Sequence, residues 1–367
     1  MSWDLGEVDA SVGPSILLEL AASPRARKRW TPTGHPGCSG ALQPKPSGCA
    51  THGGSCYAAG VWPRVLPWTE LEFGVEVEFV DADPDSVRLV PGWTMDRGDS
   101  QLALTGARSG AEAKPGKLGW AQRGEIDQIL AAIEAAGGAV NWSCGFHVHV
   151  GLEPWGESIL EPLLDATLTT QGALAELFML PPHRQLFAPE LSEAMCEAWR
   201  ANPDEDALNH VGRPQSHRCG VNVAAWYEHR SVEFRFPNAT LDGDEARRSV
   251  ELCLRWVAAV GEGRELPSEM RALAKALEVP AEGYPAPHPE PPWHRREEQL
   301  NELLIPVLQP MIEREVPGAE ILFIRATPEG LTAKTDRGGR HNHRFWFEIG
   351  EQGIRIIRIE DLGIYEG

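Results

Sequence analysis

The hydrophobic pattern of this 367-residue chain contains several segments in which apolar and polar residues alternate one by one. In a β-strand, successive side chains point to opposite faces, so each such segment predicts a strand with one apolar and one polar face. In residues 143–151 the apolar set is Cys144, Phe146, Val148 and Val150, and the polar set contains His147 and His149. This strand would carry its two imidazoles on the face turned away from the core.

Three further segments repeat this design, with acidic, basic or amide side chains on the polar face. The polar positions are Glu72, Glu76 and Glu78 in residues 71–79, Arg218 and Asn222 in residues 218–223, and Glu233 and Arg235 in residues 231–236. Charges gathered on one surface need a compensating ion. We therefore predict one antiparallel sheet with helices on its apolar back and a metal-binding cleft on its polar front.

Helical periodicity between these segments predicts the helices that pack on the sheet. The apolar sets at helical spacing are Ile126, Ile129, Leu130 and Ile133, and Val250, Cys253, Leu254 and Val257. A longer helical stretch ends near Leu180, and we expect Pro162 and Gly172 to break it. We expect Ser268 to cap a shorter helix. Residues 181–217 contain many loop signals and are predicted to form a lid over the cleft.

Composition divides the chain into four parts. Residues 1–68 are rich in Gly, Pro and Ser and are interpreted as an irregular arm. Residues 69–279 form the predicted catalytic domain. The proline-rich residues 280–294 are a predicted linker. A helix and four strand-like runs in residues 295–367 predict a small α+β accessory domain, expected to select the substrate.

The four strand-like runs of the accessory domain are residues 321–326, 330–334, 344–349 and 354–359. Between the second and third runs, residues 337–344 are basic and contain two histidines. We interpret this segment as a solvent-exposed hairpin turn, with an anion site as the alternative.

The arm contains a group of cysteines and histidines with loop-like spacing. Its members are Cys38, Cys49, His52 and Cys56, but the spacing matches no standard zinc motif. We interpret them as incidental thiols, with a zinc site or a disulfide as the alternatives. Seven cysteines is an odd number, and reduced thiols fit a cytoplasmic protein better than a disulfide framework does.

Charge and hydropathy exclude two classes of partner. The net charge of −19 opposes electrostatic attachment to nucleic acid or to anionic lipid. No run of 18 apolar residues suggests a membrane span, and the acidic residues before the apolar segment 16–20 do not fit a secretory signal. We expect a cytoplasmic protein that binds neither nucleic acid nor membrane, and its oligomeric state is left open.

The motifs and their order resemble the amidoligase family, whose members are relatives of glutamate–cysteine ligase among the glutamine synthetase-like carboxylate–amine ligases. The resemblance rests on residues 73–79, 144–151 and 232–235, and on Trp93…Asp99-Ser100 and Gly110-Ala111-Glu112 between them. It covers about residues 70–260. The sequence inverts the family's Asp-Gly-Ser element at Gly98-Asp99-Ser100, so Asp96 and Asp99 both stay candidates for that position. Ala113-Lys114-Pro115 replaces the family's Val-Ser-Pro-like run.

The resemblance implies a glutamine synthetase-like antiparallel sheet that binds ATP and Mg²⁺, with Mn²⁺ as a substitute. The positions that match the family's metal ligands are Glu76, Glu78, Glu112, His147 and Glu233. Arg235 matches its phosphate-contacting arginine, and the expected catalytic residues are Arg235, Glu233 and Asp99. The expected nucleotide-binding residues are Arg235, His149, Asn222 and Arg218. Independently of the family, an oxygen-dominated ligand set favours Mg²⁺ or Mn²⁺ over zinc.

The implied reaction joins a small-molecule or peptide carboxylate to an amine. ATP would convert the carboxylate into an acyl phosphate, and the amine would then displace phosphate to form an amide. Three alternatives stay open: a zinc hydrolase that uses His147 and His149 with one carboxylate, a phosphotransferase on the same fold, and a non-catalytic module.

Overall fold

The structure is a computed structural model, and it describes residues 60–97, 102, 110–328, 330–338, 341–351 and 353–364. The described residues belong to one compact unit, Tyr57–Gly367. Two sequence-based predictions lie outside them. These are the cysteine and histidine group of the arm (Cys38, Cys49, His52 and Cys56) and the catalytic candidate Asp99.

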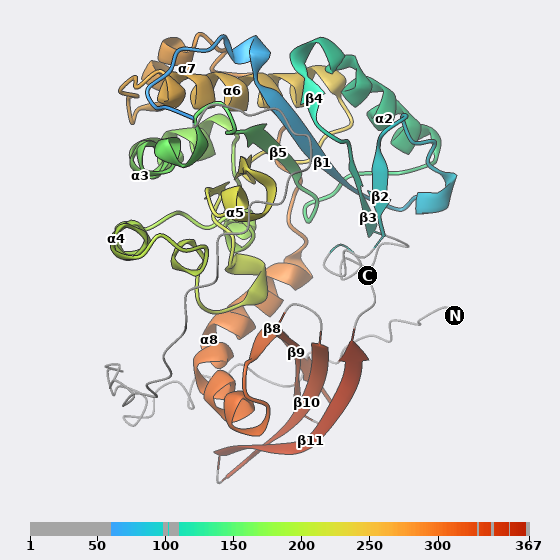
Figure 1. Ribbon diagram of the computed structural model, residues 1–367. Coiled ribbons are helices and arrows are strands. Elements are labelled where there is room, and N and C mark those ends of the chain that lie inside the picture. The colour runs from blue at the N-terminus through green and yellow to red at the C-terminus, as the bar shows by residue number, and fades with distance from the viewer. Residues whose placement is uncertain are drawn as a thin grey trace, which may run out of the picture. The chain divides into compact units, whose positions relative to one another are not determined.

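Seven of the described strands form one antiparallel sheet (Figure 1). They are β1 (Glu72–Val80), β2 (Thr94–Asp96), β3 (Gly110–Lys114), β4 (Leu118–Gly119), β5 (Phe146–Gly151), β6 (Val221–Asn222) and β7 (Ser231–Phe234). Their order is β2-β3-β1-β5-β7-β6, and β4 also pairs with β1. The four alternating segments of the sequence therefore meet in one sheet, as predicted.

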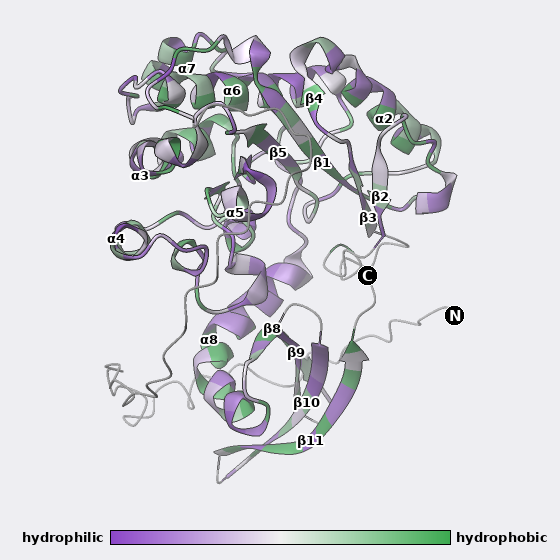
Figure 2. Cartoon of the chain, viewed as in Figure 1, coloured by the Kyte–Doolittle hydropathy of each residue, from purple (hydrophilic) through white to green (hydrophobic). Residues whose placement is uncertain are grey.

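Six helices accompany this sheet in the described part of the chain. They are α2 (Gly124–Ala135), α3 (Leu160–Leu177), α4 (Glu193–Ala201), α5 (Ala225–His229), α6 (Gly243–Gly261) and α7 (Met270–Leu277). Helix α6 packs on β5 and also contacts α2, α3 and α7, and Figure 1 shows α6 and α7 side by side. The apolar residues of these helices and of β1, β5 and β7 form one hydrophobic cluster. The mixture of apolar and polar residues along the same elements is visible in Figure 2.

Two local predictions were wrong. Helix α3 is not broken, because Pro162 lies in its first turn, where a missing N–H leaves no hydrogen bond unmade, and because packing offsets the cost of Gly172. Helix α7 is capped by Glu269 and not by Ser268, since the Glu269 carboxylate accepts hydrogen bonds from two backbone N–H groups of the first turn. Residues 181–217 are mostly irregular, as their loop signals indicate, and include one α-helix, α4, which is capped by Ser192. That they form a lid stays a prediction.

The C-terminal part of the chain forms a second, separate sheet with its own core. Its strands are β8 (Ala319–Thr327), β9 (Gly330–Arg337), β10 (His341–Gly350) and β11 (Gly353–Ile364), paired antiparallel in the order β11-β10-β9-β8. Helix α8 (Pro292–Glu315) packs on this sheet through Leu304, Leu308 and Ile312. The α+β class of the chain is thus confirmed. None of the described helices is long and apolar enough to cross a membrane.

Candidate active site

The register of the larger sheet brings the predicted metal ligands onto one face. Glu76 of β1 pairs with His147 of β5, and Glu78 of β1 pairs with Glu112 of β3. Glu233 of β7 is the partner of His149 on β5. Directly opposite residues in an antiparallel pair have Cβ atoms about 4.5–5.5 Å apart on the same face. The structure thus gathers these acidic and imidazole side chains at the centre of the sheet.

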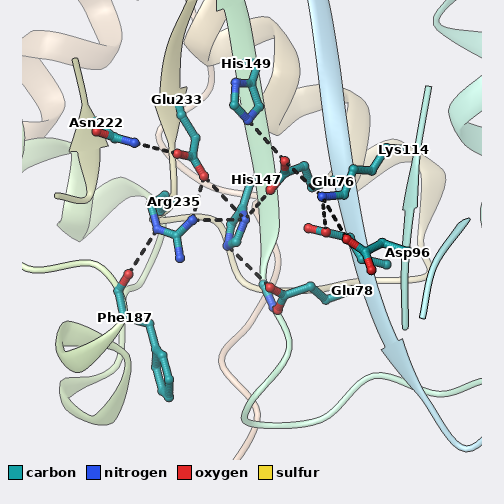
Figure 3. Close-up of polar contacts among 12 residues, drawn as sticks. Glu76, Glu78, Asp96, Lys114, His147, His149, Phe187, Asn222, Glu233 and Arg235 are labelled. Carbon is teal, nitrogen blue, oxygen red and sulfur yellow. Dashed lines mark hydrogen bonds and ion pairs between the residues drawn. The ribbon is translucent and has the colours of Figure 1, made fainter. Parts of the chain in front are cut away.

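Glu76 lies between the two histidines (Figure 3). Its Oε2 is 3.0 Å from Nδ1 of His147, and its Oε1 is 3.4 Å from Nε2 of His149. Burial alone would raise the pKa of Glu76, but its hydrogen bond with His147 and the nearby His149 hold this pKa well below the usual value. Burial lowers the pKa of His149, yet Glu76 and Glu233 outweigh it and raise that pKa. Glu76 is therefore a charged carboxylate.

Glu233 is the most deeply buried of the predicted ligands, at 1% exposure. Its carboxylate accepts hydrogen bonds from Nη1 of Arg235 at 2.6 Å and from Nδ2 of Asn222 at 2.7 Å. Burial would raise the pKa of Glu233, but the guanidinium of Arg235 lowers it to about 2. Arg235 also donates from Nε to the carbonyl oxygen of Phe187 at 3.1 Å, which fixes the plane of its guanidinium.

Lys114 is a cation inside the acidic cluster. Its Nζ lies 2.5 Å from Glu112, 3.6 Å from Glu76 and 3.7 Å from Asp96. Even so, burial and the charges of Glu76 and Glu78 raise the pKa of Glu112 to about 10. Of the two candidates for the aspartate position, Asp96 lies beside this cluster and pairs with Glu112 across β2 and β3. The cluster thus holds more acidic groups than Lys114 can neutralise, which is the setting that a divalent cation relieves.

Arg184 is a functional candidate that the sequence did not indicate, because it lies in an irregular segment after Pro181. It is 2% exposed, and donates to the carbonyl oxygens of Cys144 at 2.5 Å and Arg235 at 3.3 Å. Its Nε has no hydrogen-bond partner, and the described residues provide no carboxylate in an ion pair with it. Burial lowers the pKa of Arg184 although the charge of Glu78 opposes this effect, so an anionic ligand at this position would stabilise the guanidinium further.

Gly145 makes room for this arrangement. A Cβ atom at Gly145 would lie 2.6 Å from both Nη2 of Arg184 and Nε2 of His147. The backbone N–H of Gly145 donates a hydrogen bond to the Glu78 carboxylate. The glycine therefore lets the arginine approach His147 and, at the same time, holds a predicted metal ligand.

Two cavities reach the cluster from different sides. The smaller, of about 310 Å³, is lined by Glu76, His149, Gly74, Lys114, Gly116 and Lys117, among others. The larger, of about 490 Å³, is lined by Glu78, His147, Arg184, Arg218 and Arg235, and by Glu320 and Asp336 of the C-terminal sheet. The predicted nucleotide-binding residues are divided between them: His149 faces the smaller cavity, and Arg235 and the exposed Arg218 face the larger. Asn222 is buried behind Glu233.

The side chains present fit a divalent cation. Glu76, Glu112 and His147 can each supply one ligand atom within 4.8 Å of the others, and so can Glu76, His149 and Glu233. Carboxylate oxygens dominate both sets, as Mg²⁺ and Mn²⁺ prefer. His147 and His149 fall into different sets, which is not the arrangement expected for one zinc ion held by both histidines.

A comparison with protein families agrees with this chemistry. Residues 93–257 match the model of a family described as "Putative amidoligase enzyme". We call these residues the amidoligase region. The match confirms the resemblance seen in the sequence and indicates an enzyme of the ligase type. No curated protein matches the chain.

The amidoligase region does not contain the whole cluster. It includes Glu112, His147, Glu233 and Arg235, whereas Glu76 and Glu78 precede it on β1. Because β1 pairs with both β3 and β5, its two glutamates complete the face that the amidoligase region presents.

Proposed function

We propose that this protein is an ATP-dependent carboxylate–amine ligase that forms an amide bond through an acyl phosphate, on a sheet of the glutamine synthetase-like type. The observation that carries the proposal is the position of the acidic and imidazole cluster between two separate cavities. A ligase of this kind must bring a nucleotide and an acid together at one point, and both cavities end at this cluster.

In this proposal Glu76, Glu78, Glu112, His147 and Glu233 hold Mg²⁺, or Mn²⁺ in its place. The ion would neutralise charge on the phosphoryl group that is transferred. Arg235 points its guanidinium at the same place and is held rigid by Glu233 and Phe187, so its N–H groups need little reorganisation to stabilise developing negative charge.

We assign the nucleotide to the smaller cavity and the acid to the larger one. Lys114 and Lys117 bring two ammonium groups to the smaller cavity, where each is now paired with carboxylates and could instead contact phosphate. Gly74 and Gly116 have no atoms within 4 Å of an added Cβ, so a ligand can approach the backbone closely. Arg184 gives the larger cavity a buried cation whose Nε has no hydrogen-bond partner among the described residues. An oxygen of the acid's carboxylate would attack the γ-phosphorus and displace ADP. The amine nitrogen would then attack the acyl carbon and release phosphate.

The experiment that tests the proposal is an assay of ADP and phosphate release with Mg²⁺, ATP and pools of carboxylic acids and amines. A ligase releases both products only when an acid is present, and forms an amide when an amine is added. Formation of a stable phosphorylated product, with ADP but no free phosphate, identifies a phosphotransferase. Hydrolysis that needs zinc and no ATP overturns the proposal in favour of a zinc hydrolase.

Substitution of Arg184 tests the assignment of the acid to the larger cavity. We expect Arg184→Gln to raise the KM for the acid about 10–100-fold, because a charge-assisted hydrogen bond contributes about 1.5–3 kcal/mol. The KM for ATP should stay within about twofold of wild type. Arg184→Lys keeps the charge and should lie between the two. Steady-state kinetics with the acid and ATP varied in turn measure both constants, and an unchanged KM for the acid in a folded Arg184→Gln protein contradicts the assignment.

A further inference from the structure

The C-terminal sheet carries a second group of metal-ligating side chains, far from the larger sheet in the sequence. His341 and His343 lie on β10 and Asp361 lies on β11, and each can supply one ligand atom within 4.8 Å of the others. Nε2 of His341 is 2.7 Å from Oδ1 of Asp361, and the two imidazole centres are 4.5 Å apart. Residues two apart on a strand share a face, so both histidines point to the same side.

A bulge in β11 aligns the carboxylate with the histidines. His343 pairs with Asp361, but the preceding Asn342 pairs with Gly363, so Leu362 is the extra residue of the bulge. Gly363 has a φ of +81°, which a residue with a side chain rarely adopts, and its N–H donates to Oδ1 of Asp361 at 2.8 Å. Bulges of this kind re-aim side chains and are common near functional sites.

His343 is the unusual member of the group. It is 7% exposed, and its Nδ1 is buried with no hydrogen-bond partner. A buried ring nitrogen without a partner is energetically unfavourable unless something else binds it. Arg337, which pairs with His341 across β9 and β10, is exposed and its charge is solvated.

We propose that His341, His343 and Asp361 form a binding site for a transition-metal ion of the zinc class. Two imidazoles and one carboxylate are a donor set that Zn²⁺, Co²⁺ and Ni²⁺ prefer and that Mg²⁺ does not. Three protein ligands leave at least one coordination position open. The site is separate from the acidic cluster of the larger sheet and does not depend on the proposed ligase activity.

The position of the site suggests what the ion does. The ion would join the start of β10 to the last residues of β11, at the end of this strand pair that lies away from its turn. Asp336 and Gly338, at the end of β9, line the larger cavity, and Asp336 pairs with Asn342 between the two histidines. A bound ion would therefore stabilise the end of the C-terminal sheet that borders this cavity.

A titration of the full-length protein with Co²⁺ tests the proposal. Excess Mg²⁺ is present throughout to occupy the oxygen-rich cluster of the larger sheet. We expect one equivalent of Co²⁺ to bind with the visible absorption bands of a low-coordinate site, and we expect Zn²⁺ to displace it. Asp361→Asn and His341→Gln should each weaken binding at least about 10-fold. Asp361→Asn preserves the oxygen that accepts from Gly363, so the hairpin should stay folded.

Asn342→Ala is the matched control, because Asn342 lies between the two histidines and its side chain points to the opposite face of β10. It should bind Co²⁺ as wild type does. A thermal melt provides the second readout: Zn²⁺ should raise the Tm of wild type and of Asn342→Ala but not of Asp361→Asn. The proposal is overturned if wild type binds no Co²⁺, if the substitutions leave binding unchanged, or if His147→Asn removes the signal instead.

Discussion

Glu78→Gln lowers the Mg²⁺-dependent turnover of ATP about 10²–10³-fold and leaves the protein folded. The substitution removes one of the charges that would hold the cation, and a charge-stabilising contact of this kind typically contributes that factor to the rate. The amide oxygen of Gln can still accept the hydrogen bond from the Gly145 N–H. Loss of the charge also relieves repulsion with Glu76 and Glu112, so the Tm should be equal to that of wild type or higher.

ADP release and a thermal melt measure these two effects in the same preparation. Glu134→Gln, on the exposed side of α2, is the matched control and should resemble wild type in both. Glu233→Gln should differ from Glu78→Gln, because it also breaks the buried pair with Arg235 and should lower the Tm. Wild-type turnover in folded Glu78→Gln would show that the metal site is not where we place it.

Arg235→Lys lowers the turnover about 10²-fold although it preserves the positive charge. The guanidinium of Arg235 bonds Glu233 from Nη1 and Phe187 from Nε at the same time, and Nη1 lies 3.5 Å from Nδ1 of His147. A lysine side chain ends in one ammonium nitrogen and lacks the planar group of N–H donors that a guanidinium has. It therefore cannot replace both contacts and also donate to the transferred phosphoryl group of the proposed reaction.

The turnover number at saturating ATP checks this prediction, since the loss should lie in kcat and not in the KM for ATP. Arg200→Lys on α4 is the control, because Arg200 forms only surface ion pairs with Glu161 and Asp165. If Arg235→Lys retains the wild-type kcat, charge alone is sufficient at this position and the geometric role is wrong.

The face of each long strand could be predicted from the sequence because the side-chain period of a strand is two. Phe146, Val148 and Val150 are fully buried in the apolar cluster, and His147 and Glu76 meet on the other side of the sheet. Alternation determines which residues share a face. It does not determine which strand lies beside which, and the family resemblance supplied the order in which these strands contribute to one site.

The parts of the site that could not be predicted lie in segments where apolar and polar residues do not alternate regularly. Arg184 belongs to a short helical turn after Pro181, and its role depends on the carbonyl oxygens of Cys144 and Arg235, which are distant in the sequence. Lys114 is the last residue of a five-residue strand. Glycine and alanine occupy three of its positions, so the sequence shows no clear alternation of apolar and polar residues there. The ion pairs of Lys114 with Glu76 and Asp96 arise only from the pairing of three strands.

The larger cavity is bordered by two independent hydrophobic cores. Arg184 and Arg235 belong to the part of the chain built on the larger sheet, whereas Glu320 and Asp336 belong to the sheet packed on α8. Mutations that reshape the smaller core can therefore alter the outer wall of the cavity without disturbing the strands that hold the acidic cluster. If the larger cavity holds the acid, as we propose, this division would let substrate preferences change while the residues of the acidic cluster stay the same.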